Sequence, residues 1–491
     1  MLPESVKSCV FLCVAVVFSA ASAIELTAWK GERVNAFLPA GEKISSASGG
    51  FEIKVGELKS VKYRQGRKWN VWTSAVDRVV WGDRRLVANE RRMIQIKVPR
   101  SAKAKTYSFG DVRVKVLDRT ITPVEKRQYY LDLWQHPWSV ARWHKVKPFS
   151  PEHYDAMRPL WKELALLGQK VITATIVRYP WSRQCYDGYE TMVRHIKNED
   201  GTWSFDYSLF DEYVAFAKEC GLGPDIACYS ICPWDEGRVW WDEKGKRDCT
   251  ARVKPGTPEF EAYWGPFLVD FSKHLKKKGW FKDALIALDE RTPEDTRTVA
   301  AFVQKMAPGL RVSMAGNCPP SKFEGIKLDV YSQSMEHISK KYLEEAVERR
   351  AKGFKTTYYV CNSPLSPNTL IFCYPEEGYY LGLYPVTAGL DGFLRWAYNS
   401  WAANPIECSD YASLFSGDTF LVYPDSSPSI RLLMLQNGLE AAEKFQQLRS
   451  EGGRDAELDE LSKLLSEKNA LWKGEETFKK LRKAADDILN K

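Results

Sequence analysis

The period of the hydrophobic pattern changes after residue 122. Between residues 24 and 122, apolar and polar residues alternate in short runs such as FEIKVGEL, MIQIKVP and DVRVKVLD, separated by turns rich in Gly, Ser, Lys and Arg. Such alternation is typical of strands with one buried face, because successive side chains of a strand point to opposite sides. The pattern predicts an antiparallel β-sandwich domain over residues 24–122. We favour a bracing role for it over carbohydrate binding, since it contains few clustered aromatic residues.

From residue 126 to residue 429, short apolar runs alternate with longer amphipathic stretches of helical period. The apolar runs predict eight strands, at residues 129–135, 171–177, 226–232, 284–290, 310–316, 328–334, 355–362 and 392–401. Several of the helical stretches open with Ser, Thr or Asp and close with Gly, as helix caps do. Eight such units in succession predict an α/β fold, a (β/α)8 barrel of the TIM type.

The last segment, residues 430–491, is helical in pattern and rich in Lys, Glu, Leu and Ala. It carries no evident chemistry. We expect it to pack on the barrel or to extend as a helical hairpin, with dimerisation as the alternative. The pattern assigns no oligomeric state.

The first 23 residues have the pattern of a signal peptide. Lys7 precedes an apolar run over residues 10–18, and small residues follow up to Ala23. We expect cleavage after Ala23 and a secreted or periplasmic protein, with a retained N-terminal anchor as the alternative. No later run approaches about 20 apolar residues, so no stable membrane span is expected after cleavage. Export permits disulfides, but the nine cysteines that follow cannot be paired from the sequence.

Composition and motifs exclude several functions. The formal net charge of +8 is spread over 491 residues without a block of Lys and Arg, so no nucleic-acid partner is expected. Glycine-rich phosphate loops are missing, and none of the six histidines belongs to an HExxH motif. We therefore expect no cofactor and no metal site.

The chemistry of such barrels lies at the carboxyl ends of their strands. Aromatic, amide and acidic residues dominate these predicted ends, a mixture that suits a sugar, because aromatic rings stack on pyranose faces while carboxylates and amides bind hydroxyls. The residues concerned are His136, Trp138, Arg178, Tyr179, Trp181, Trp234, Asp235, Asp289, Glu290, Arg291, Asn317, Gln333, Asn362, Trp396, Tyr398, Asn399 and Trp401.

Two adjacent acids, Asp289 and Glu290, end the apolar strand ALIALDE. Neighbouring strand residues ordinarily face opposite sides, but this alternation relaxes where the backbone turns into a loop. Both carboxylates can then face one pocket. The alternative is that Asp289 caps the following turn while Glu290 pairs with Arg291 or another cation.

Residues 126–440 resemble the catalytic domain of glycoside hydrolase family 123, the retaining β-N-acetylgalactosaminidases. The resemblance lies in YYLDLWQHPWSVARWHKVKPFSPEHY, GQKVITATI, DGTWSFDYSLFDEYV, CYSICPW, ALDE, YYVCN, LDGFLRWAYNSW and GDTFLVYP. It implies an enzyme with an oligosaccharide or glycoconjugate substrate, preceded by a sandwich-like domain. By the same resemblance, Asp289 and Glu290 align with the adjacent catalytic pair of the family.

Adjacent acids fit one mechanism better than another. A retaining glycosidase usually has two carboxyl groups about 5 to 5.5 Å apart on either side of the scissile bond, which neighbours at one strand end do not easily straddle. In substrate-assisted catalysis, the 2-acetamido oxygen of the sugar attacks the anomeric carbon instead. Glu290 would then be the acid and base, with a raised pKa. Asp289 would stay ionised and bind the acetamido N–H.

Substrate contacts are expected from other strand ends. Trp396 and Trp401 are predicted to stack on the sugar, and Tyr359 or Tyr331 to donate a hydrogen bond near the acetamide. Gln333, Asn362 and His136 are predicted to bind hydroxyls. Some of these aromatics could pack between barrel and helices instead, and the alternative function is a non-catalytic carbohydrate-binding or scaffold protein that retains a glycosidase-like barrel.

Overall fold

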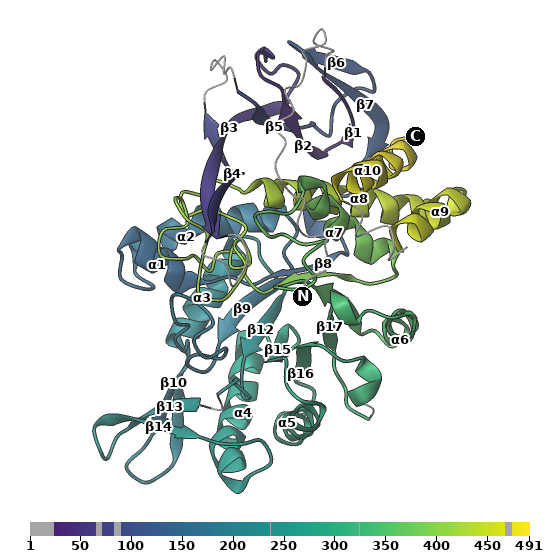
Figure 1. The fold of residues 1–491 in the computed structure, drawn as a ribbon. Coiled ribbons are helices and arrows are strands. Elements are labelled where there is room, and N and C mark those ends of the chain that lie inside the picture. Colours follow the sequence, from purple (N-terminus) through teal and green to yellow (C-terminus); the bar gives the residue numbers. More distant parts are fainter. Residues whose placement is uncertain (1–23, 65–70, 83–89, 236, 324, 467–473) are drawn as a thin grey trace.

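The computed structural model describes residues 24–64, 71–82, 90–235, 237–323, 325–466 and 474–491. The predicted signal peptide, residues 1–23, lies outside the described residues. Figure 1 shows the N-terminal strands at the top, a barrel at the centre and the C-terminal helices beside them. Within the described ranges, no helix combines the length and the apolar character that a membrane crossing requires.

Seven N-terminal strands form two sheets, as the alternating pattern predicts. Their bounds are β1 Ile24–Lys30, β2 Arg33–Leu38, β3 Glu52–Arg64, β4 Trp72–Gly82, β5 Arg92–Lys97, β6 Thr106–Phe109 and β7 Val112–Thr120. The sheet orders are β1-β7-β6 and β2-β5-β3-β4. All pairings are antiparallel except that of β1 with β7. Apolar side chains of both sheets, including Ile53, Ile94 and Val114, form a shared core.

The eight strands predicted for the barrel are all present and form one parallel sheet. They are β8 Tyr130–Leu133, β9 Val171–Thr175, β12 Asp225–Tyr229, β15 Ala284–Asp289, β16 Arg311–Gly316, β17 Val330–Ser334, β18 Lys355–Tyr359 and β19 Gly392–Arg395. Their order is β8-β19-β18-β17-β16-β15-β12-β9, which confirms the TIM-type barrel.

The barrel closes between β8 and β9 largely through side chains. One backbone bond joins Lys170 N to Leu131 O, at 2.9 Å. The Gln169 amide oxygen accepts from Leu133 N, and the Gln135 amide oxygen accepts from Thr173 N, each at 2.9 Å. The two amides thus satisfy backbone groups that a regular strand pairing would satisfy.

Helices follow most of the barrel strands. Their bounds are α1 Pro137–His144, α2 Pro151–Leu166, α3 Ser208–Glu219, α4 Pro258–Lys278, α5 Pro293–Met306, α6 Lys340–Ala351 and α7 Pro375–Thr387, with short 3-10 helices at Val124–Lys126, Pro320–Phe323 and Met335–His337. Side chains of Ser150, Thr257, Thr292 and Ser339 cap α2, α4, α5 and α6. Gly279, with φ +75°, ends α4.

A four-stranded sheet, called here the inserted sheet, was not predicted. It consists of β10 Arg194–Lys197, β11 Trp203–Asp206, β13 Gly237–Asp242 and β14 Arg247–Arg252, in the order β11-β10-β13-β14. Its hairpins lie in the segments that follow β9 and β12, and Figure 1 shows it projecting beside α4. The strands are short and mostly part-exposed, so their hydrophobic pattern is weak.

The C-terminal helices are α8 Ile430–Glu451, α9 Asp455–Ser466 and α10 Glu475–Leu489. Helix α8 is buried at every residue from Ile430 to Phe445, because it lies between α7 of the barrel and strands β2 and β4 of the sandwich. The helical segment therefore packs on the barrel, which was one of the two arrangements expected from the sequence.

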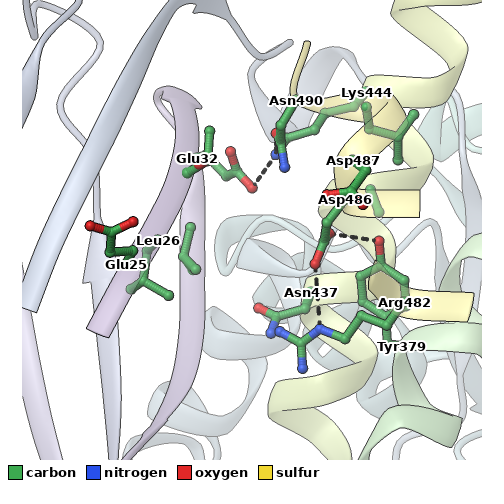
Figure 2. Close-up of a pocket in the computed structure, with 14 residues that line it drawn as sticks. Glu25, Leu26, Glu32, Tyr379, Asn437, Lys444, Arg482, Asp486, Asp487 and Asn490 are labelled. Atoms are coloured by element: carbon green, nitrogen blue, oxygen red, sulfur yellow. Dashed lines mark hydrogen bonds and ion pairs between the residues drawn. The ribbon is translucent and has the colours of Figure 1, made fainter. Parts of the chain in front are cut away.

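Buried polar pairs join α8 to the sandwich. Arg431 Nη2 lies 2.8 Å from Asp77 Oδ2, and Lys444 Nζ lies 2.6 Å from Glu32 Oε1. Figure 2 shows the second pair at a polar cavity of about 310 Å³ between the sandwich and helices α7, α8 and α10. Removing one partner of such a pair would leave the other buried and uncompensated, so these contacts fix the sandwich on the helices. This arrangement agrees with the bracing role.

Helices α7 and α8 approach each other closely at glycines in both helices. A Cβ at Gly438 would overlap the Tyr379 carbonyl oxygen and lie 3.0 Å from Gly382 Cα. Neither contact can relax without moving a helix, so we expect Gly438→Ala to lower the free energy of unfolding by about 3 kcal/mol, measured by urea denaturation.

Gly265→Ala in α4 is the matched control. There the added methyl would lie 3.3 Å from the flexible end of Met306, and alanine gains up to about 1 kcal/mol of helix propensity over glycine. Equal stability of the two variants would contradict the close crossing.

Candidate active site

The backbone turns sharply between the two acids. Asp289 is the last residue of β15, and Glu290 has φ +48°, a left-handed conformation uncommon for residues other than glycine. Glu290 N donates to Ala315 O at 2.7 Å, which anchors this turn on β16. Both side chains consequently line one cavity, as the relaxed alternation at a strand end predicts.

This cavity, called here the acid cavity, has a volume of about 150 Å³ and lies at the carboxyl ends of the barrel strands. Its walls combine aromatic rings, an amide pair and three carboxylates. The lining residues are Trp134, Gln184, Trp234, Asp289, Glu290, Ala315, Tyr359, Cys361, Asn362, Leu394, Trp396 and Asp418.

The structural roles considered for the two acids are filled by other residues. The Thr292 side chain caps α5 by accepting from Asp295 N. Arg291 pairs with Asp295 at 3.7 Å, and among the described residues no ion pair joins Arg291 to Glu290. Tyr359 Oη instead donates to Glu290 Oε1 at 2.7 Å.

The electrostatic environment of Asp289 differs from the expectation that this carboxylate stays ionised. Burial, and then the neighbouring Glu290 carboxylate, raise the pKa of Asp289 well above its ordinary value, while the indole N–H groups of Trp181 and Trp234 and the charge of Arg291 oppose this rise. Sequence reasoning assigned the raised pKa to Glu290 and kept Asp289 ionised. Burial and the two carboxylates also raise the pKa of Tyr359, so this phenol keeps its proton.

Packed aromatic rings support the inner wall of the cavity. The ring centroids of Trp134, Trp181 and Tyr229 lie 4.7 to 4.9 Å from one another. Trp134 Nε1 also contacts Asp132 Oδ2 at 3.3 Å, and burial raises the pKa of Asp132 to about 7. This packing fixes the Trp134 ring that faces the cavity.

A third carboxylate, Asp418, lies in the cavity wall and was not predicted. Its Oδ1 accepts from the fully buried Arg395 at 2.6 Å, and its Oδ2 accepts from Trp396 Nε1 at 3.3 Å. Two donors thus hold it in a fixed orientation. Asp418 belongs to the motif GDTFLVYP, and this motif was the signal in the sequence from which Asp418 could have been predicted. In the described part of the chain, no three His, Cys, Asp or Glu side chains gather as a metal site would require.

Comparison with protein families identifies the barrel. A family model described as glycoside hydrolase 123, catalytic domain, matches residues 134–448. The chain belongs to glycoside hydrolase family 123. No curated protein matches the sequence.

A solved structure of the same family shares the fold. A family 123 glycoside hydrolase from Clostridium perfringens, described in a study of glycolipid glycan hydrolysis, is 24% identical, with a TM-score of 0.83 over 96% of this chain and 92% of that chain. The catalytic domain of a β-amylase from Paenibacillus polymyxa is 10% identical, with a TM-score of 0.37 over 64% of this chain and 98% of that chain. Active domain 2 of a chitinase from Pyrococcus furiosus is 10% identical, with a TM-score of 0.33 over 64% and 96%.

Five of the nine residues predicted for the family 123 site line the acid cavity: Asp289, Glu290, Tyr359, Asn362 and Trp396. The other four do not line it. Strand parity and packing explain the difference.

Tyr331 and Gln333 lie on the outer side of β17. Ser332, between them, is in register with the cavity residue Ala315 and therefore faces inward. Tyr331 accordingly packs on Phe323 and Tyr342 in the layer between barrel and helices, and donates to a loop carbonyl. Fully buried Gln333 shares this side of the strand.

His136 and Trp401 are also fully buried away from the cavity lining. The Trp401 indole donates to Val422 O at 2.7 Å. The His136 ring stacks on Tyr189 with centroids 3.8 Å apart, and Nε2 lies 2.9 Å from Asp187 O. Burial lowers the pKa of His136 to about 3, so it is neutral at physiological pH.

Proposed function

We propose that this family 123 hydrolase removes β-linked N-acetylgalactosamine, or a related N-acetylhexosamine, from an oligosaccharide or glycoconjugate by substrate-assisted, retaining catalysis. The observation that carries the proposal is the adjacent pair Asp289 and Glu290, which shares one cavity. Because both acids come from the same strand end, they do not easily take opposite sides of a glycosidic bond. The substrate's own acetamido oxygen removes the need for a protein nucleophile.

Glu290 is the proposed acid and base. It protonates the leaving oxygen while the acetamido oxygen attacks the anomeric carbon, and in the second step it takes a proton from the water that opens the oxazoline. The bond from Tyr359 Oη to Glu290 Oε1 orients this carboxyl group and leaves Oε2 to meet the substrate.

Asp289 is the proposed partner of the acetamido N–H. That proton becomes more acidic as the oxazoline ring forms, and a carboxylate with a raised pKa is the stronger acceptor for it. The positive charge that develops on the closing ring in turn favours the ionised form of Asp289.

Other residues that line the acid cavity are proposed to bind the substrate. We place Trp396 and Trp134 against the sugar faces, and Asn362 and Asp418 at its hydroxyls, because all four line the cavity. The description of the Clostridium perfringens relative makes glycolipid glycans one substrate class to test.

The proposal predicts hydrolysis of aryl β-N-acetylgalactosaminide, followed in parallel with aryl β-N-acetylglucosaminide and an aryl β-galactoside. Because the acetamido group is the nucleophile, the galactoside should be at least about 10³-fold slower, as expected for loss of a positioned intramolecular nucleophile. A thiazoline analogue of the oxazoline should inhibit strongly. Inactivity on both acetamido sugars would overturn the enzymatic reading in favour of a non-catalytic binding protein, and a covalent sugar trapped on a carboxylate would show a conventional nucleophile.

We also propose that residues 1–23 direct export to the periplasm or outside the cell. Mass spectrometry of the protein from its native host should then give a chain that begins at Ile24. A chain that retains Met1 would contradict cleavage.

A further inference from the structure

One face of the inserted sheet turns toward α4. In register, Lys197 of β10 lies opposite Trp203 of β11 and Asp242 of β13, so Lys197, Trp203, Arg238 and Trp240 share a side of the sheet. Tyr263 of α4 contacts this side, with its ring centroid 4.9 Å from that of Trp203.

Arg238 on this face is a buried cation that forms no ion pair with any residue the structure describes. It is 4% exposed, and its guanidinium carbon lies 4.5 Å from the centroid of the Tyr263 ring. Its Nε atom has no hydrogen-bond partner, and no carboxylate in the described ranges pairs with it. Burial lowers the pKa of Arg238 to about 10, so it still carries its charge at neutral pH. A buried charge without a partner is costly.

A hollow of about 850 Å³ opens beside Arg238, between the inserted sheet and α4. Its lining includes the two cations Lys197 and Arg238, the rings of Trp203, Trp240 and Tyr263, and one carboxylate, Glu259 at the start of α4. The indoles of Trp203 and Trp240 are part-exposed, and no lining residue is shared with the acid cavity. The hollow is therefore a separate place on the molecule.

We infer that this hollow is an accessory binding site for an anionic saccharide, with Arg238 and Lys197 binding its acidic group and the part-exposed indoles stacking on a sugar ring. The inference is independent of the proposed reaction. Two features of the hollow indicate this ligand. A simple anion would not contact the indoles, and a neutral sugar would give Arg238 no counter-charge. The acidic group is a carboxylate or a sulfate ester, both of which match the planar donors of arginine.

The test is isothermal titration of the full-length Glu290→Gln protein, in which the proposed turnover is slowed, in N-acetylgalactosamine at a concentration chosen to saturate the acid cavity. The probe is a chondroitin 4-sulfate tetrasaccharide, which carries both acidic groups. We expect binding that weakens as salt is raised, and at least a tenfold loss of affinity in Arg238→Gln and in Trp240→Ala.

Arg194→Gln is the matched control. The guanidinium of Arg194 lies 5.3 Å from the ring centroid of Trp241 on the opposite side of the same sheet, and Arg194 lines neither the hollow nor the acid cavity. Its affinity should equal that of the parent. The inference is overturned if the parent fails to bind, if Arg238→Gln binds as tightly as the parent, or if Arg194→Gln loses as much affinity.

Three further probes separate the sources of charge. Desulfated chondroitin tetrasaccharide carries carboxylates only, inorganic sulfate carries no ring, and neutral chitotetraose carries no charge. Retained binding of the desulfated probe assigns the site to carboxylates, and its loss assigns the site to sulfate esters. Equal binding of chitotetraose, or binding of free sulfate as tight as that of the tetrasaccharide, would contradict an anionic saccharide site.

Melting curves test whether a variant at Arg238 still folds. Arg238→Met removes an unpaired buried charge and keeps much of the side-chain volume, so it should fold with a melting temperature at or above that of the parent. The tetrasaccharide should raise the melting temperature of the parent by mass action but not that of Arg238→Met. An equal rise in both proteins would contradict the role of Arg238.

Discussion

Glu290→Gln should lower kcat/KM on a β-N-acetylgalactosaminide with a poor leaving group by about 10² to 10⁴-fold, the usual contribution of a positioned general acid. The glutamine keeps the shape and can still accept the Tyr359 hydrogen bond, but it has no proton to transfer. With a dinitrophenyl leaving group, which departs without protonation, kcat/KM should fall far less. Initial rates across a series of aryl leaving groups measure the difference.

The matched control is Glu190→Gln, a half-exposed glutamate that pairs with Arg178 in the loop after β9. It makes the same chemical change outside the acid cavity and should leave the rates within about twofold, as for an exposed ion pair. A uniform loss of rate for Glu290→Gln across all leaving groups would contradict its role as the acid.

Asp289→Asn should lower kcat by about 10² to 10³-fold, the loss typical of one preorganised charge-stabilising group. The wild-type rate should in addition fall as pH decreases through the raised pKa of Asp289, because only the ionised form accepts the acetamido proton. This acidic limb should lie above the ordinary range of aspartates and should be missing from the residual activity of the variant. Profiles of kcat against pH measure it, and Asp132, whose pKa is about 7, is unchanged in both proteins.

The stability of the folded protein should change with pH in the direction opposite to its activity. The folded pKa of Asp289 is raised, so the folded state holds its proton more tightly than the unfolded state, and stability declines as pH rises from the ordinary aspartate pKa to the raised one. Asparagine abolishes this decline, so Asp289→Asn should match the wild-type melting temperature at low pH and exceed it at neutral pH. Asp235→Asn, a change in the loop after β12 outside the acid cavity, should show neither effect. Equal wild-type and Asp289→Asn melting curves at every pH would contradict the buried, paired environment of Asp289.

The elements with strong periodicity could be predicted from the sequence. The barrel strands are short apolar runs with helices between them, and the end of the fourth such run located the two acids. The inserted sheet was missed because strands such as RHIK and WSFD are too short and too exposed to show a period.

The candidate site was predicted less completely than the fold. Tyr331 and Tyr359 both belong to apolar strands, but only their parity within the closed barrel decides that Tyr359 reaches Glu290 while Tyr331 packs against helix residues. Asp418 lies 22 residues beyond its partner Trp396 in a loop of its own, and no local pattern brings such a residue into the cavity. The raised pKa of Asp289 depends first on burial, which only the folded arrangement provides.

Helix α8 has a consequence for dissecting this protein. The sequence divides at residues 122–126, yet α8, at the far end of the chain, is buried by both halves, and its Arg431 and Lys444 take their carboxylates from Asp77 and Glu32 of the sandwich. A gene fragment cut at that apparent boundary would encode a barrel whose longest helix presents two orphaned cations and an apolar flank to water. The sandwich, the barrel and α8 therefore form one structural unit, which cannot be divided at residues 122–126 without exposing these groups.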